Sequence, residues 1–207
     1  FRINSEHAIS KRFTFGQSLY ISYGNQRVDG TGGNRSPLTN VVRMQPYLPV
    51  RDPTKQGGFR GPENSFDGSD PTNPVEFALL NETYVKTIRV LGTAYLDVNI
   101  MPWLKFRSTF GTDYANQLQT IYIPLFNDGG TGSATTATLN NIRLNYTTLL
   151  YTQALSFDKT FDQHHIGAVV VYEQQGQKLR DERQSGNQST NDVRTLTGAT
   201  NIATSQR

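Results

Sequence analysis

Two short runs of acidic, amide and glycine residues are the first candidates for chemistry in this sequence. Asp67-Gly68-Ser69-Asp70 and Asn127-Asp128-Gly129-Gly130 carry the oxygen atoms that Ca²⁺ prefers as ligands. Neither run has the spacing of a known calcium loop, which a bidentate acid closes at its end. Because Asx and Gly residues also make tight turns, we interpret both runs as turns and expect no metal.

Catalytic groups are equally hard to assemble from this sequence. The adjacent residues His164 and His165 would point to opposite faces of a strand, so they cannot easily share one ion. The chain has no cysteine, which removes disulfides and thiolate catalysis. Nothing fixes two acids at a working separation. We therefore expect no enzyme activity, no catalytic residue and no cofactor.

The first long polar stretch, residues 25–86, is better suited to binding a ligand than to catalysis. Its aromatic and arginine side chains can stack on or hydrogen-bond to sugars and peptides. The candidates for contact with a substrate or a partner protein are Arg43, Tyr47, Arg51, Phe59, Arg60 and Phe66. The alternative is that these side chains pack the loop onto itself, and the sequence leaves both interpretations open.

The elements that would position such a loop are strands. Five segments alternate apolar and polar residues with a period of two, whereas a helix would place apolar residues three and four apart. These segments are residues 12–24, 87–100, 104–114, 142–157 and 166–172. Residues 1–4 look like the tail of an earlier strand.

The connections between these strands alternate strictly in length. Polar stretches at 25–86, 115–141 and 174–207 alternate with short turns at 5–11, 101–103 and 158–163. Loops beyond about 12–15 residues are uncommon in soluble domains, but a membrane barrel has short periplasmic turns and long extracellular loops. Strands of about 10–15 residues are also long enough to cross a bilayer.

Composition agrees with such a barrel. Hydrophobic residues make up 35% of the 207 residues, the mean hydropathy is -0.53, and no run of about 18 apolar residues exists, so a transmembrane helix is excluded. Barrel strands turn only alternate side chains to lipid and tolerate this average. The net charge of +3 comes from scattered residues, so no nucleic-acid footprint is visible.

The sequence thus predicts an all-β fold: a segment of an antiparallel up-and-down transmembrane β-barrel, with about five strands plus a strand tail. So few strands cannot close a membrane barrel, whose smallest forms have about eight. We therefore expect residues 1–207 to be part of one larger barrel domain. No initiator Met or signal segment opens the chain, so we expect it to start within a longer protein.

Charged residues fall on the polar parity of two of these strands. Arg89 and Asp97 lie on one, and Lys105, Arg107 and Asp113 lie on the next. In a barrel this parity faces the lumen, so we predict ion pairs across the strands or with a domain inside the barrel.

The order and spacing of several phrases resemble the barrel of SusC/RagA-type TonB-dependent outer-membrane transporters. The phrases are Asn73-Pro74-Val75, residues 89–96 (RVLGTAYL), 104–114 (LKFRSTFGTDY) and 155–161 (LSFDKTF), then His165 before a Val-rich strand ending Tyr172-Glu173-Gln174. The resemblance implies a barrel in the bacterial outer membrane, in contact with its lipid, that imports glycans, oligosaccharides or peptides. It also implies a SusD-like surface lipoprotein as partner and coupling to TonB through a plug domain that, like the remaining strands, is absent here.

A second interpretation is a soluble or secreted all-β module that binds glycans or proteins. In such a sandwich the apolar parity of each strand would be buried between two sheets. The mixed faces of several strands favour this alternative, while the loop asymmetry, the strand lengths and the resemblance count against it.

Overall fold

The computed structural model describes residues 1–28, 37–68, 71–80, 82–130 and 133–207. The chain divides into two compact units. Unit 1 contains residues 1–24, 87–117 and 144–180, and unit 2 contains residues 25–86, 118–143 and 181–207. Neither of the helices in the described residues is long and apolar enough to cross a membrane.

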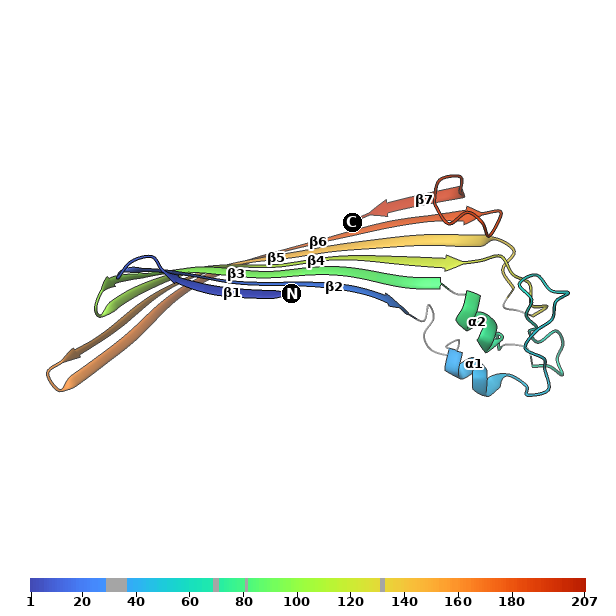
Figure 1. Ribbon diagram of the computed structural model, residues 1–207, viewed down its shortest axis with the longest axis horizontal. Coiled ribbons are helices and arrows are strands. Elements are labelled where there is room, and N and C mark those ends of the chain that lie inside the picture. The colour runs from blue at the N-terminus through green and yellow to red at the C-terminus, as the bar shows by residue number, and fades with distance from the viewer. Residues whose placement is uncertain (29–36, 69–70, 81, 131–132) are drawn as a thin grey trace. The chain divides into compact units, whose positions relative to one another are not determined.

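Seven strands pair in chain order into one antiparallel sheet (Figure 1). Their bounds are β1 Arg2–Ala8, β2 Phe13–Arg27, β3 Glu82–Met101, β4 Leu104–Ile123, β5 Ala137–Phe161, β6 His164–Gln188 and β7 Thr200–Gln206. Each strand pairs with the next one along the chain, as in an up-and-down arrangement. The predicted all-β fold of antiparallel neighbours is therefore confirmed.

Tight turns join the strands at the ends where the sequence predicts short connections. Pro102 and Trp103 link β3 to β4, where a proline is tolerated because it has no N–H to give to the ladder. Asp162 and Gln163 link β5 to β6, with Asp162 at a φ of 50°. An aspartate tolerates this left-handed conformation better than most residues do.

The strands extend further than the sequence predicts. The expected strand tail at residues 1–4 is the full strand β1, β6 continues from the predicted end at 172 to Gln188, and β7 lies inside the expected loop 174–207. Beyond Tyr172 both parities of β6 are polar except at Leu179, so the period-two signal disappears. The backbone ladder continues because its hydrogen bonds do not depend on side-chain polarity.

One face of the sheet in unit 1 carries no charge over most of its length. Gln153 Nε2 donates to Ser108 Oγ (2.9 Å) and Asn116 to Asn145, so even positions of β4 share a face with odd positions of β5. We call this side the uncharged face. It contains the odd positions of 13–23 and 147–157 and the even positions of 88–100, 104–114 and 166–176, none of which is Asp, Glu, Lys, Arg or His.

Apolar side chains of the uncharged face are not covered by any other part of unit 1. Phe110 is 49% exposed, Tyr151 43% and Val170 70%. All residues of unit 1 are described, and none of its hydrophobic side chains is buried. The opposite side of the same strands, which we call the ion-paired face, carries Arg89, Asp97 and their partners.

Unit 2, in contrast, has a small apolar core. Tyr122, Ala137 and Leu139 are buried together, with Leu125 and Leu196 packed against them. Two helices, α1 (Pro37–Arg43) and α2 (Pro74–Leu80), interrupt the first long connection. Asn73 caps α2, since its Oδ1 accepts from the N–H groups of Val75 (3.0 Å) and Glu76 (3.2 Å), and Pro74 follows at the first helical position.

Candidate functional site

Asp97 organises the ion-paired face of unit 1. Its two carboxylate oxygens accept from Arg107 Nε at 2.5 Å and Nη2 at 2.7 Å, and Lys105 Nζ lies 2.8 Å from Oδ2. Asp97 is only 5% exposed. A bidentate arginine and a lysine on one carboxylate fix the positions of three side chains and connect β3 to β4.

A second ion pair lies on the same face and is more open to solvent. Arg89 Nε is 2.9 Å from Asp113 Oδ1, and Arg89 Nη2 is 2.6 Å from Oδ2. The Arg89 side chain is 48% exposed and that of Asp113 is 23% exposed. The structure therefore brings all five charged candidates from the sequence into cross-strand ion pairs.

Tyr95 extends this network to β1 and β2, which the sequence did not reveal. The Arg107 guanidinium lies 4.5 Å from the centre of the Tyr95 ring, and the Tyr95 hydroxyl donates to the Glu6 carboxylate. The ring reaches Glu6 by lying over Gly16, where a Cβ atom would collide with it. The sequence does show that Tyr95 and Gly16 share the parity of the charged positions. It does not show that Tyr95 contacts Glu6, because the two residues lie far apart in the chain.

The network is built to hold charges in place. Each of its carboxylates accepts from a cation or a phenol on another strand: Asp97 and Asp113 from an arginine on the adjacent strand, and Glu6 from Tyr95 two strands away. Such a surface is polar and rigid, and it presents the exposed parts of Arg89, Lys105 and Arg107 to whatever lies on that side of the sheet.

Two of the six loop candidates, Arg51 and Phe59, pack against each other within the loop. Phe59 is 2% exposed, and the guanidinium of Arg51 stacks over its ring at 3.9 Å. Phe59 is therefore part of the loop's packing and presents no surface to a ligand. Arg51 is exposed, but one face of its guanidinium is covered by the Phe59 ring.

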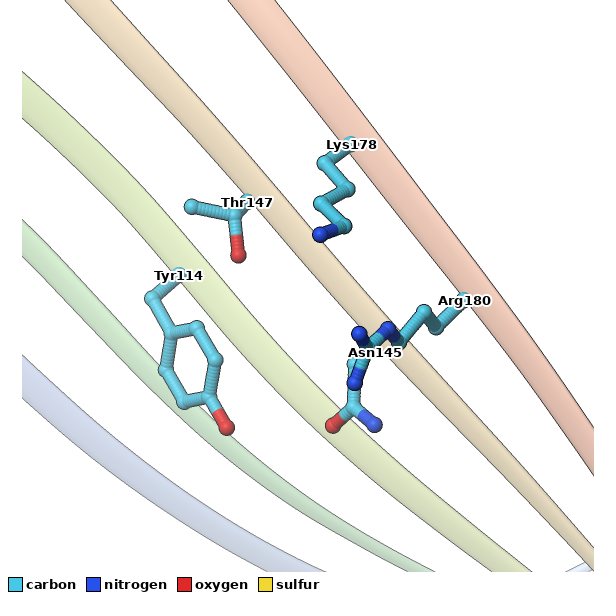
Figure 2. Close-up of a pocket in the computed structure, with 5 residues that line it drawn as sticks. All are labelled: Tyr114, Asn145, Thr147, Lys178 and Arg180. Carbon is cyan, nitrogen blue, oxygen red and sulfur yellow. The ribbon is translucent and has the colours of Figure 1, made fainter.

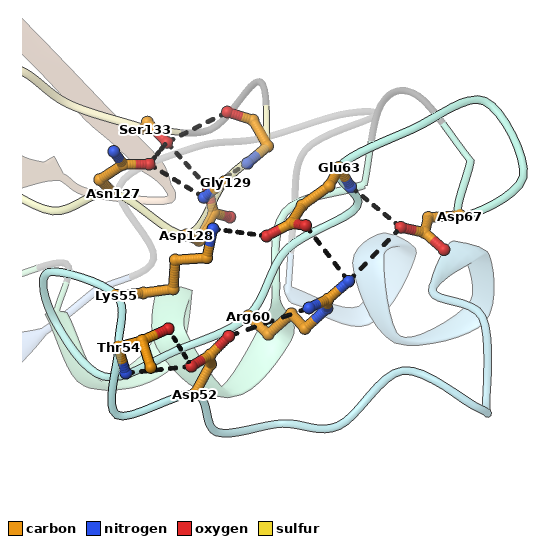
Figure 3. Close-up of polar contacts among 11 residues, drawn as sticks. Asp52, Thr54, Lys55, Arg60, Glu63, Asp67, Asn127, Asp128, Gly129 and Ser133 are labelled. Atoms are coloured by element: carbon orange, nitrogen blue, oxygen red, sulfur yellow. Dashed lines mark hydrogen bonds and ion pairs between the residues drawn. The ribbon is translucent and has the colours of Figure 1, made fainter.

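Arg60 is held by three acids of the same loop (Figure 3). Its Nη2 lies 3.3 Å from Glu63 Oε2 and 4.0 Å from Asp67 Oδ2, and its Nη1 lies 3.8 Å from Asp52 Oδ2. Lys55 adds an ion pair of 2.6 Å to Glu63. This cluster braces the loop and explains why a lone arginine in a loop sequence need not be a ligand contact.

The remaining candidates, Arg43, Tyr47 and Phe66, are at the surface. Phe66 is 88% exposed and Tyr47 is 62% exposed. The Tyr47 hydroxyl donates to the Phe66 carbonyl (2.8 Å) and to Asp67 Oδ1 (3.1 Å). Partial desolvation and then this bond to Asp67 raise the pKa of Tyr47 above its ordinary value. Arg43 is exposed in the last turn of α1.

The run at Asn127 is a turn, as the sequence analysis suggested. Asn127 Oδ1 accepts from the Gly129 N–H (3.0 Å), and Asp128 Oδ1 accepts from Gly130 N–H (2.9 Å) and Ser133 Oγ (3.0 Å) (Figure 3). In the other run, Ser69 and Asp70 lie outside the described residues. Among the residues that the structure describes, no three acidic or histidine side chains gather as metal ligands would.

A buried pair of carboxyl groups joins two segments of unit 2. Glu76 of α2 is 1% exposed and Asp128 is 0% exposed. Burial, and then the charge of Asp128, raise the pKa of Glu76 to about 8. Glu76 is therefore protonated at neutral pH and can donate to Asp128. The two residues are far apart in the sequence and show no motif, so this contact could be found only in the structure.

Solved structures with this fold include three chains of RagAB. They are a RagAB peptide importer in the "closed-closed" state (TM-score 0.76, 15% identity, 100% of this chain), the same importer in the "open-open" state (0.77, 16%, 100%) and a RagAB peptide transporter (0.75, 14%, 99%). This chain spans only 23–24% of the length of those chains. No protein-family model and no curated protein matches the sequence. The fold expected from the SusC/RagA resemblance is confirmed.

Proposed function

We propose that this chain forms part of the wall of a TonB-dependent transporter barrel in the bacterial outer membrane. The observation that carries the proposal is the difference between the two faces of the same strands in unit 1. One face has no charge over most of its length and exposes Phe110, Tyr151 and Val170, while the other holds the ion pairs around Asp97. In a barrel wall the first would contact lipid and the second would face the polar interior.

The length of the uncharged face fits a bilayer. On β4 it runs from Leu104 to Tyr114, a stretch that rises about 33 Å. Strands of a membrane barrel tilt by about 35–45°, so this stretch would cover a band roughly 25 Å tall. That is the height expected of the apolar band of an outer-membrane barrel.

A sandwich fits unit 1 less well. In a sandwich the apolar parity would be buried against a second sheet. In unit 1, all of whose residues are described, no hydrophobic side chain is buried. Lipid is the solvent that makes such exposure favourable.

Short peptides are the cargo we propose first, with glycans or oligosaccharides as the alternative. The support is that similar solved structures are those of a peptide importer, together with the polar groups that the loop exposes. Arg43, Tyr47 and Phe66 are the loop candidates at the surface, and the rings of Tyr47 and Phe66 could stack on a side chain or a sugar ring.

A SusD-like surface lipoprotein is the partner that this assignment requires, and TonB would act through a plug domain outside this chain. Helix α1 exposes Leu38 (80%), Val41 (58%) and Val42 (86%), side chains that a partner protein could cover. The proposal involves no catalytic step, because the acids of the ion-paired face are held by cations and a phenol.

The test is to find the protein and then remove it. We expect the polypeptide that carries this sequence to sediment with the outer membrane, to be several-fold heavier than 23.2 kDa, and to migrate differently before and after heating. A deletion strain should lose uptake of labelled oligopeptides. Loss of oligosaccharide uptake alone would show that the cargo is an oligosaccharide and not a peptide. A soluble species of 23.2 kDa would contradict the proposal of a transporter.

A further inference from the structure

On β6 of unit 1, cations follow the uncharged positions at one end of the strand. On β6 the even positions from Ile166 to Gly176 are uncharged, and the next two are Lys178 and Arg180. Along β6 these are the first basic residues on that face beyond the stretch proposed to contact lipid. They lie toward the end of the strand that leads to the longer connections, away from the tight turn at Asp162.

Lys178 and Arg180 line an open pocket together with residues of β4 and β5 (Figure 2). Tyr114, Asn145 and Thr147 complete the lining, and the pocket has a volume of about 340 Å³. Figure 2 shows the Lys178 ammonium and the Arg180 guanidinium directed over β5, with the Tyr114 hydroxyl beyond them. The pocket therefore gathers two cations, a phenol, an amide and a hydroxyl.

The lining contains no acid, and within the part of the chain that the structure describes neither Lys178 nor Arg180 forms an ion pair. The charged residues of the ion-paired face, such as Asp97 and Asp113, are held by cations of their own face. Two cations beside hydroxyl and amide donors form a surface that favours an anion with several acceptor oxygens, of which phosphate is the best match.

We propose that this pocket binds a phosphate of an anionic lipid headgroup in the leaflet that adjoins the long connections. The inference rests on the proposed orientation of the barrel wall. Lys178 and Arg180 follow the end of the band of roughly 25 Å by two and four residues, which is about 7–13 Å further along the strand. At that distance the lipid offers headgroups in place of acyl chains.

Tyr114 supports a lipid over a soluble anion. It lies in the pocket and is 38% exposed at the end of the uncharged run of β4. An aromatic ring with a polar tip is suited to the boundary between acyl chains and headgroups. A ligand that combines phosphate with acyl chains would contact both the cations and the apolar positions next to them.

The experiment compares two double variants of the full-length protein in detergent. Lys178→Gln with Arg180→Gln removes both cations from the pocket. Lys11→Gln with Arg12→Gln makes the same change of charge in the exposed turn between β1 and β2, and serves as the matched control. Binding is measured against a bisphosphorylated glycolipid (lipid A), the same lipid after dephosphorylation, and inorganic phosphate.

We expect the pocket variant to bind lipid A about 10- to 30-fold more weakly than the wild type, since each cation near an anionic lipid contributes on the order of tenfold or less. The control variant should bind as the wild type does, and dephosphorylation should weaken wild-type binding by a similar factor. Equal lipid binding by the wild type and the pocket variant would overturn the proposal, as would competition by inorganic phosphate at the same affinity as the lipid.

Migration before and after heating identifies any variant that fails to fold. In that case the single variant Lys178→Gln takes the place of the double variant and should bind lipid A more weakly by on the order of tenfold or less. Lys178→Arg, which keeps the charge, should bind as the wild type does. If the lipid proposal alone is wrong, the protein is still found in the outer membrane and still imports peptides. Failure of the proposed function appears earlier, as a protein that is not found in the outer membrane.

Discussion

Unit 1 and unit 2 treat apolar and charged side chains in different ways. Unit 1 leaves its large apolar residues exposed on one face and partners its charges on the other, with Asp97 nearly enclosed by Lys105 and Arg107. Unit 2 buries apolar residues such as Phe59 and Tyr122, as a water-soluble protein does, and it also buries the carboxyl groups of Glu76 and Asp128.

Under the proposed function, this difference follows from the solvent that each set of residues meets. Water drives apolar side chains into a core, as in unit 2. Lipid removes that driving force, so a sheet in a bilayer can expose its apolar parity without a core. The two regions should therefore respond to substitution as residues in these two solvents do.

The largest effect is expected on the uncharged face. Tyr151→Arg places a charge near the middle of the proposed apolar band, where it should lower the free energy of unfolding from bilayers by about 2–4 kcal/mol. The matched variant, Thr152→Arg on the ion-paired face, should lower it by less than about 1 kcal/mol. Urea titration of the full-length protein in lipid vesicles measures both. Equal losses would remove the distinction between the faces.

The ion-paired face should depend on its enclosed carboxylate more than on its exposed one. Asp97→Asn leaves Lys105 and Arg107 without their shared partner and should cost about 1.5–3 kcal/mol. Asp113→Asn removes the partner of the half-exposed Arg89 and should cost about 0.2–1 kcal/mol. The same titration ranks the two, and the reverse order would show that the network around Asp97 is not the stabilising one.

Gly16 tests the contact that carries the network to β1. An alanine there would collide with the Tyr95 ring and push its hydroxyl away from Glu6. Overpacking of this kind costs about 1–3 kcal/mol. Gly24→Ala, at a position with open space around it, is the control and should change stability little. If both alanines are tolerated equally, Tyr95 does not lie over β2 as described.

The smallest effect for a single step, one pH unit, concerns the pH response of unit 2. The pKa of Glu76 is about 8 in the folded protein against an ordinary value of 4.5, so the folded state holds this proton more tightly than the unfolded state. The contribution of Glu76 to the free energy of unfolding is therefore fully present below about pH 4.5 and is lost as the pH rises to about 8.

Protection factors from amide hydrogen exchange report this decline at Gly61 and Gly130, which donate to Asp128. They should fall by up to about tenfold per pH unit in that window, which is the limit for one proton. Glu76→Gln should flatten the dependence. An unchanged slope in this variant would show that Glu76 does not release a proton on opening.

Alternation of side chains was enough to predict the sheet, its antiparallel order and the face that carries Asp97. It failed where both parities become polar, so β6 was expected to end at residue 172 and β7 was missed. Strand pairing there depends on backbone hydrogen bonds, and these leave no mark on hydropathy.

The candidate residues show a similar division. Arg89, Asp97, Lys105, Arg107 and Asp113 could be placed on one face by parity alone, and the structure pairs them. The loop has no repeating pattern of apolar and polar residues. The sequence therefore could not show that Phe59 is buried or that Arg60 is held by acids. Glu6 and Asp128 were missed because their partners lie far away in the sequence.

The most direct test of the central claim is a scan of β5 with single cysteines at positions 148–157 of the full-length protein in bilayers. This chain has no cysteine of its own, so within it each introduced label is unique. We predict that spin labels at the odd positions, including 149, 151 and 155, collide with oxygen dissolved in lipid, while those at the even positions collide with a water-soluble reagent. Equal access of both parities to the water-soluble reagent, or protection of the odd positions from both reagents, would contradict the assignment of the uncharged face to lipid.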